Sequence, residues 1–134
     1  MREDELLALY GLDPNPQYRD QIRQKLEEEI HQLHVEDHEY LKTLCVMLFC
    51  MGNVEDTQLI WQAKRKNQDT GSYIDVQLLC GAGYEETISY LDLQEDVLAL
   101  AELQYLRQCE PYDFVHFSKA EWVSHYKRYY GISR

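Results

Sequence analysis

Three histidines and a glutamate in the first third of the chain have types and spacing that could bind a metal. His31, His34 and His38 stand at positions i, i+3 and i+7, and Glu27 precedes them by one helical turn. On a continuous helix the four side chains share a face, and imidazole and carboxylate groups are common ligands of divalent cations. The neighbouring residues are polar, so we interpret the group as a solvated surface cluster and predict neither a metal nor a cofactor.

Two pairs of adjacent carboxylates could support acid–base chemistry or bind a cationic partner. Glu55-Asp56 and Glu85-Glu86 each follow a short turn, where a helix is expected to begin. Acid–base catalysis would require burial and a partner that separates their pKa values. We predict instead that the four residues form an acidic edge that contacts another protein. The alternative is that they only complement the positive ends of helix dipoles.

Motifs of other catalytic classes are missing from the sequence. The Gly81–Gly83 stretch follows no strand and precedes no lysine, so it does not resemble a phosphate-binding loop. GxSxG, HExxH and Cys–His patterns are also absent. Cys45, Cys50 and Cys80 lie in apolar stretches without a CxxC pair, which indicates buried free thiols. We predict that the protein is not an enzyme.

Aromatic residues provide a second set of candidate contacts. The chain has eleven tyrosines and two tryptophans, and many aromatic residues concentrate near the C-terminus. Much of this must be core, but Tyr and Trp are also common anchors at protein interfaces. We therefore add two residues to the predicted contact set. These are Tyr84, beside the second acidic pair, and Trp122, near Lys127 and Arg128.

The charge is strongly acidic and unevenly distributed. The formal net charge is −11, and residues 1–117 hold 23 acidic and 9 basic side chains, while residues 118–134 have an excess of basic ones. Nucleic-acid binding needs clustered Lys and Arg, so this class of partner is disfavoured. Such a field attracts a basic protein and speeds its encounter. The alternative interpretation is that the charge serves solubility alone.

The 134 residues fit one domain, spanning 1–134, which can fold without disulfide or metal. The longest apolar run, from Leu44 to Met51, is far shorter than the roughly 20 residues that span a bilayer. Glu3, Asp4 and Glu5 occupy the positions where a signal peptide would be cationic. We expect a cytoplasmic protein that does not enter membranes.

Hydrophobic periodicity and capping residues predict helices throughout and no strand, so the predicted fold class is all-α. The least certain boundary is the break near His34–Glu36, where one kinked helix from Pro16 to Met51 is the alternative. Residues 67–72 are predicted to be a polar loop, and Asp92 with Glu95 to form a capping box. The expected helices cover residues 3–10, 16–33, 37–51, 54–66, 73–80, 84–91, 93–109 and 119–130.

An offset of 30 residues aligns two parts of the chain. Val46, Leu48 and Cys50 match Val76, Leu78 and Cys80, and the pairs Glu55/Glu85 and Thr57/Thr87 are also identical. This predicts an αα-hairpin used twice, near 41–66 and 73–92, in a short solenoid-like stack. A compact irregular bundle remains the alternative.

Part of the repeat also resembles a class of known proteins. The stretches 52–64 and 74–87 look similar to small helical bacterial proteins encoded beside secreted toxins, and the resemblance covers residues 44–91. The resemblance implies an immunity-type role, in which the protein blocks the surface of a basic toxin such as a nuclease. The contact residues expected for that role are Glu55, Asp56, Tyr84, Glu85, Glu86 and Trp122. A metal-dependent hydrolase that uses the His and carboxylate groups, and a self-associating structural protein, are the alternatives.

Overall fold

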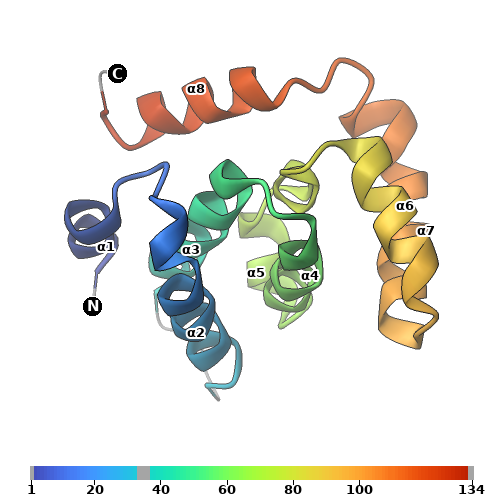
Figure 1. Cartoon of the computed structure of the whole chain (residues 1–134), viewed down its shortest axis with the longest axis horizontal. Coiled ribbons are helices and arrows are strands. Elements are labelled where there is room, and N and C mark those ends of the chain that lie inside the picture. Colours follow the sequence, from blue (N-terminus) through green and yellow to red (C-terminus); the bar gives the residue numbers. More distant parts are fainter. Residues whose placement is uncertain (1, 33–36, 133–134) are drawn as a thin grey trace.

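The computed structural model describes residues 2–32 and 37–132, and this part of the chain is all-helical (Figure 1). The predicted all-α class is therefore correct. The described residues contain eight α-helices and three short 3-10 helices, and none of them is in a strand. The elements are α1 (Glu3–Tyr10), η1 (Pro16–Tyr18), α2 (Arg19–Ile30), α3 (His38–Met51), η2 (Val54–Asp56), α4 (Thr57–Lys64), α5 (Gln68–Tyr73), η3 (Val76–Cys80), α6 (Tyr84–Gln94), α7 (Val97–Asp113) and α8 (Lys119–Tyr129).

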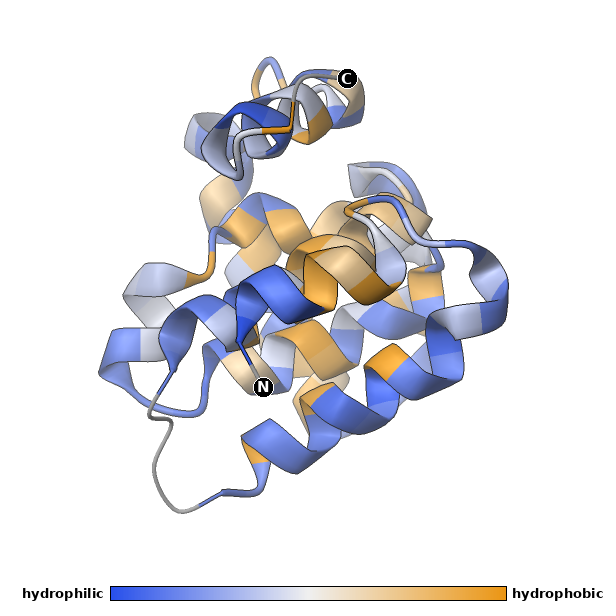
Figure 2. Cartoon of the chain, turned by 90° about the vertical axis from the view of Figure 1, so that its left-hand side faces the viewer, coloured by the Kyte–Doolittle hydropathy of each residue, from blue (hydrophilic) through white to orange (hydrophobic). Residues whose placement is uncertain are grey.

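Helix α3 is the centre of the core. Every residue from Tyr40 to Cys50 is buried, and all of them except Lys42 and Thr43 are hydrophobic. Helices α1, α2 and α5 and the 3-10 helix η3 pack around it. Figure 2 shows hydrophobic segments gathered in the middle of the molecule, while more hydrophilic segments lie outside. None of the helices in residues 2–32 and 37–132 is both long and apolar enough to cross a bilayer.

The predicted starts of η1 and α3 and the predicted end of α3 are confirmed, whereas α2 ends at Ile30, three residues before the expected end. Asn15 and Asp37 accept hydrogen bonds from backbone N–H groups at the starts of η1 and α3, and Gly52 ends α3 in the left-handed conformation. Helix α2 ends at Ile30, eight residues before α3 begins, so a single helix from Pro16 to Met51 does not form. The predicted break at His34–Glu36 falls outside the described residues.

The predicted loop at residues 67–72 is wrong, because this segment forms α5. The Asn67 side chain accepts from the Thr70 N–H, and the Thr70 hydroxyl accepts from the Asn67 N–H, which is a reciprocal capping box. The predicted helix at 73–80 is also wrong, since the chain is extended at Ile74 and only Val76–Cys80 is helical, as 3-10 turns. The buried Lys64 ammonium donates to the carbonyl oxygens of Gly71, at 2.6 Å, and Ile74, at 2.5 Å, and so stabilises this bend.

Two predicted boundaries around α7 are also wrong. The capping box of Asp92 and Glu95 does not form, because α6 continues to Gln94 and Glu95 takes a left-handed conformation with φ of 54°. Asp96 instead caps α7, accepting from the Ala99 N–H at 2.7 Å. Helix α7 then continues past the expected stop and contains Pro111. The proline lies in the exposed last turn, so it removes only one intrahelical hydrogen bond there.

The two copies of the aligned sequence pattern do not fold alike. The first begins with the 14-residue α3, whereas the second has the five-residue η3 in its place. The helices that pack together most extensively are α2 with α3 and α6 with α7, which are not the hairpins expected near 41–66 and 73–92 (Figure 1). The turns that follow α3 and η3 lie close together, since a Cβ on Gly52 would be 3.2 Å from the Gly81 carbonyl oxygen.

Helix α8 lies across one side of the molecule and is held there by long aromatic side chains (Figure 1). Tyr126 is fully buried, stacks edge-on against Phe49 and donates its hydroxyl hydrogen to Asp75. The Lys42 ammonium of α3 lies beneath it, 5.7 Å from the ring centre of Tyr126 and 4.7 Å from that of Tyr129. These contacts position Trp122 and the basic residues of α8.

Candidate protein-binding surface

Asp56 does not belong to an exposed edge. Its side chain is 1% exposed and accepts hydrogen bonds from two arginines of α2. The Arg19 guanidinium donates twice, at 3.0 and 2.8 Å, and Arg23 makes a third contact. The paired Asp56 carboxylate raises the pKa of Arg19 through the hydrogen bonds and their charge. The expectation that Asp56 contacts a partner is therefore corrected: its carboxylate joins α2 to the start of α4.

The other three acidic residues of the predicted edge are exposed. Glu55 belongs to η2, which packs against α6, and Glu85 and Glu86 lie in the first turn of α6. None of the three forms an ion pair with another residue of the described chain. The structure therefore brings Glu55 to the same side of the molecule as α6 and leaves these carboxylates accessible.

The two predicted aromatic contacts are only half-buried. The Tyr84 ring lies 5.0 Å from that of Phe114, and burial raises the pKa of its hydroxyl. The Trp122 ring lies 5.7 Å from that of Tyr126, on α8. Both rings therefore pack on the core while part of each surface faces solvent. Tyr84 adjoins the exposed glutamates in α6, but Trp122 belongs to a different element.

The histidine cluster does not assemble in the described residues. His31 follows the end of α2, where its Nδ1 contacts the Glu27 carbonyl oxygen at 2.7 Å, and His38 begins α3 and lies near the Tyr73 ring. His34 falls outside the described residues. Across residues 2–32 and 37–132, no group of three or more His, Cys, Asp or Glu side chains is arranged to hold a metal.

The cysteines predicted to be buried free thiols are correctly assigned. Cys45, Cys50 and Cys80 are buried and unpaired, and Cys109 is half-buried. Burial raises the pKa of the Cys50 and Cys80 thiols to about 12, so neither is a thiolate near neutral pH. Cys45, Cys50 and Cys80 are therefore part of the hydrophobic core.

The sequence prediction missed an exposed apolar surface on α7. Ala99, Glu102, Leu103 and Leu106 recur at helical spacing and are buried. Val97 is 81% exposed and Leu100 is 53% exposed. Together with Ala101, these two residues form the outer stripe of α7, at positions i, i+3 and i+4. The sequence contains an indication of this exposure. Five consecutive apolar residues, Val97–Ala101, point to all sides of a helix, so they cannot all face one core.

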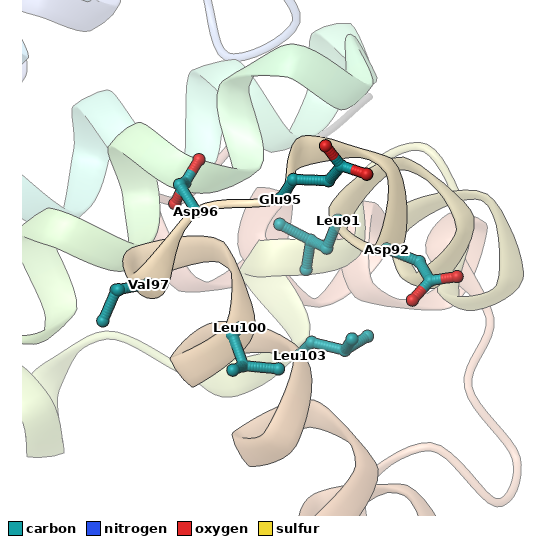
Figure 3. A pocket seen from close by; sticks show the side chains of 7 residues that line it. All are labelled: Leu91, Asp92, Glu95, Asp96, Val97, Leu100 and Leu103. Atoms are coloured by element: carbon teal, nitrogen blue, oxygen red, sulfur yellow. The ribbon is translucent and has the colours of Figure 1, made fainter.

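The outer stripe borders a pocket between the end of α6 and the start of α7. The pocket has a volume of about 320 Å³, which is enough for one or two large apolar side chains. Figure 3 shows that both helices contribute leucines and that carboxylates stand beside them. The lining residues are Leu91, Asp92, Glu95, Asp96, Val97, Leu100 and Leu103.

The charge around this pocket is almost entirely negative. The segment from Tyr84 to Asp113, which forms α6 and α7, contains eight acidic side chains and one basic side chain, Arg107. In the formal count, with every carboxyl group charged, this helical pair contributes −7 of the net charge of −11. It lies at one end of the long axis of the molecule, away from α1 and α2 (Figure 1). The pocket combines an apolar floor with an acidic border.

Glu102 lies on the opposite, buried side of α7. Its carboxyl group is completely enclosed and accepts a hydrogen bond from the Thr57 hydroxyl, while its Oε1 atom has no hydrogen-bond partner. Burial raises the pKa of Glu102 to about 8, so the side chain is mainly neutral at pH 7. A protonated carboxyl can tolerate this position, whereas an unpaired carboxylate would be costly.

Comparison of the chain with protein-family profiles, curated proteins and solved structures finds no match.

Proposed function

We propose that this protein is an acidic protein-binding module whose partner is a basic protein. The observation that carries the proposal is the pocket between α6 and α7, where exposed Val97 and Leu100 adjoin the carboxylates of Asp92 and Glu95. Apolar anchors supply much of the affinity at protein interfaces, and surrounding charges select the partner and accelerate its encounter. Glu55 in η2, together with Glu85 and Glu86 in the first turn of α6, extends the same acidic field.

The narrower form of the proposal is an immunity-type role. Its support is the resemblance of residues 44–91 to small helical proteins encoded beside secreted toxins. In that role the protein occludes the active surface of a basic toxin, such as a nuclease, in the cell that produces it. A nuclease surface is cationic because it binds phosphates, so it complements the −11 charge.

The test compares three forms of the full chain as bait in a lysate of the organism that encodes it. Leu100→Asp alters the pocket, and Leu9→Asp is a matched control because Leu9 in α1 is 55% exposed, much like Leu100. We expect a basic protein to be retained by the wild type and by Leu9→Asp, and to be lost with Leu100→Asp. Equal retention by all three forms contradicts the proposal.

The retained protein is then purified and its affinity measured directly. We expect the Leu100→Asp substitution to increase the Kd by about tenfold or more. The Kd of the wild type should also increase with salt concentration. The immunity role is tested separately, by expressing the partner in cells with and without this protein. Growth that is equally poor in both cultures, or equally good, would refute the immunity role but leave the binding function standing.

A further inference from the structure

We infer that the occupant of the α6–α7 pocket is an amphipathic helix whose apolar stripe is flanked by Lys or Arg. The inference rests on the proposed binding function and specifies which kind of segment the partner presents. Its first support is the outer stripe of α7, because residues at i, i+3 and i+4 form the ridge that packs against a neighbouring helix. Val97, Leu100 and Ala101 have this spacing and are exposed.

The pocket beside the stripe supplies a place for an anchor. Leu91 of α6 and Leu103 of α7 are buried at its floor, while the Leu100 side chain remains half-exposed at its edge (Figure 3). A single large apolar side chain of the partner, entering between Leu91 and Leu100, would bury apolar surface on both helices. The apolar part of the stripe is short, since Gln104 continues it one turn later. The contact therefore spans one to two helical turns.

Other modes of peptide recognition do not fit this surface. Strand addition needs an exposed sheet edge, and none of the described residues forms a strand. Proline-rich segments dock between aromatic side chains, but no aromatic residue lines the pocket. Phosphorylated or acidic segments need arginine clusters, whereas the residues lining this pocket are acidic or apolar. A helix packed into the groove is the mode that the apolar stripe and the pocket fit.

The carboxylates determine the charge of the occupant. Asp92, Glu95 and Asp96 lie within five residues of one another at the border of the pocket. A second copy of this chain placed face to face would bring the same carboxylates together, which like-charge repulsion opposes. An anionic membrane surface is disfavoured for the same reason. Lysine or arginine residues on either side of the apolar anchors would pair with the border.

The inference is tested with a synthetic probe and the full chain. The probe is a peptide of about 16 residues with leucines at i, i+3, i+4 and i+7 and lysines elsewhere. The control peptide has the same composition with leucines at alternate positions, which removes the helical stripe. We expect the helical peptide to bind at least about tenfold more tightly in fluorescence anisotropy, and Leu100→Asp to abolish that difference while Leu9→Asp preserves it.

A second pair of variants separates the charge contribution. Asp92→Asn with Glu95→Gln should weaken the helical peptide several-fold and reduce the salt dependence of its affinity. Glu5→Gln with Glu28→Gln changes the net charge equally at exposed positions on α1 and α2, and should have little effect. Asp96 is left intact because it caps α7.

Three results would overturn the inference. These are equal binding of the two peptides, binding of neither, and assembly of the chain alone into a dimer that Leu100→Asp dissociates. Equal binding of the two peptides would indicate that the lysines are attracted to the acidic surface without recognition of a helix. A dimer that Leu100→Asp dissociates would identify a second copy of the chain as the occupant. The proposed function is contradicted by a different result, namely that no basic protein is captured from the lysate in a way that depends on Leu100.

Discussion

The Thr57 hydroxyl donates a hydrogen bond to the Glu102 carboxyl group across the buried contact between α4 and α7. The other carboxyl oxygen of Glu102 has no hydrogen-bond partner. This pair joins α7, whose outer stripe borders the proposed binding pocket, to the core of the protein. The protonation state of the Glu102 carboxyl group therefore influences how strongly α7, and α6 packed against it, is held to the rest of the core.

The first prediction concerns the pH dependence of stability. The pKa of Glu102 is about 8 in the folded protein and near 4.5 when the residue is in water. Between these values the folded state holds a proton that the unfolded state has lost, so the free energy of unfolding decreases as pH rises through this interval. In the Glu102→Gln variant the side chain keeps its shape but has no ionisable group. Its stability relative to wild type should increase by roughly 4 kcal/mol between about pH 5 and about pH 9.

Urea denaturation of both proteins at several pH values measures this difference. Other titrating groups contribute equally to the two proteins, so the difference isolates Glu102. If the stability difference between the Glu102→Gln variant and the wild type is the same at all pH values, the raised pKa is wrong.

The second prediction concerns Asp56 and the two arginines of α2. Replacing Asp56 with Asn leaves Arg19 and Arg23 close together without their shared carboxylate. We expect the free energy of unfolding to fall by about 2–4 kcal/mol, because the substitution removes a buried negative charge that pairs with both arginines. The loss is limited because water partly solvates the two guanidinium groups. Glu55→Gln is the matched control, since Glu55 is adjacent and exposed, and should change stability by less than about 0.5 kcal/mol. Equal effects of the two variants would contradict the assigned role of Asp56.

The sequence predicted those parts of the fold that depend on local chemistry. Asn15, Asp37 and Gly52 cap or end helices through contacts with residues a few positions away, so their roles are visible in the sequence. Helix α5 was missed because its residues read as polar turn formers, and Asn67 and Thr70 are stabilised by each other and by the carbonyl oxygen of Lys64. The start of α7 was misplaced because Asp92 and Asp96 are equally good N-caps by type.

The binding surface was less predictable than the helices. The sequence indicated an acidic protein, but Asp56 is neutralised by Arg19 and Arg23, which are more than 30 residues away in the chain. Which carboxylates remain exposed depends on such long-range packing. The outer stripe of α7 was not recognised as exposed, because an apolar residue in the sequence does not reveal whether another element is available to cover it.

The third prediction concerns the attachment of α8. Tyr126→Ala removes a fully buried ring and its hydrogen bond to Asp75, and should lower the free energy of unfolding by about 3–5 kcal/mol. Limited proteolysis should then cleave the chain near residues 114–118 faster than in the wild type. Tyr112→Ala is the control, because Tyr112 is 83% exposed, and should leave both measurements nearly unchanged. Unaltered proteolysis of Tyr126→Ala would show that other contacts hold α8.

The fourth prediction concerns the contact between the Gly81 turn and α3. A Cβ at Gly81 would lie 2.5 Å from the Phe49 carbonyl oxygen, so Gly81→Ala forces the backbone apart. We expect a loss of about 1–3 kcal/mol in the free energy of unfolding. Gly71→Ala in α5 is the control. Its new methyl group would lie 3.4 Å from the Lys64 carbonyl oxygen, an ordinary van der Waals distance, and alanine favours the helical conformation more than glycine does. Thermal denaturation should show a lower Tm for the first variant and an equal or higher Tm for the second.

The fifth prediction distinguishes the two sides of α7. Leu100 is 53% exposed, so Leu100→Asp should change the free energy of unfolding by less than about 0.5 kcal/mol, while Leu103, at 3% exposed, cannot be replaced by Asp without placing a carboxylate in the core. Circular dichroism during urea denaturation should therefore show a native-like transition for Leu100→Asp and an unfolded or strongly destabilised chain for Leu103→Asp. A Leu100→Asp chain that fails to fold would mean that Leu100 already packs against the rest of the chain. The α7 stripe would then have no free face for a partner, and a loss of binding in that variant would report unfolding.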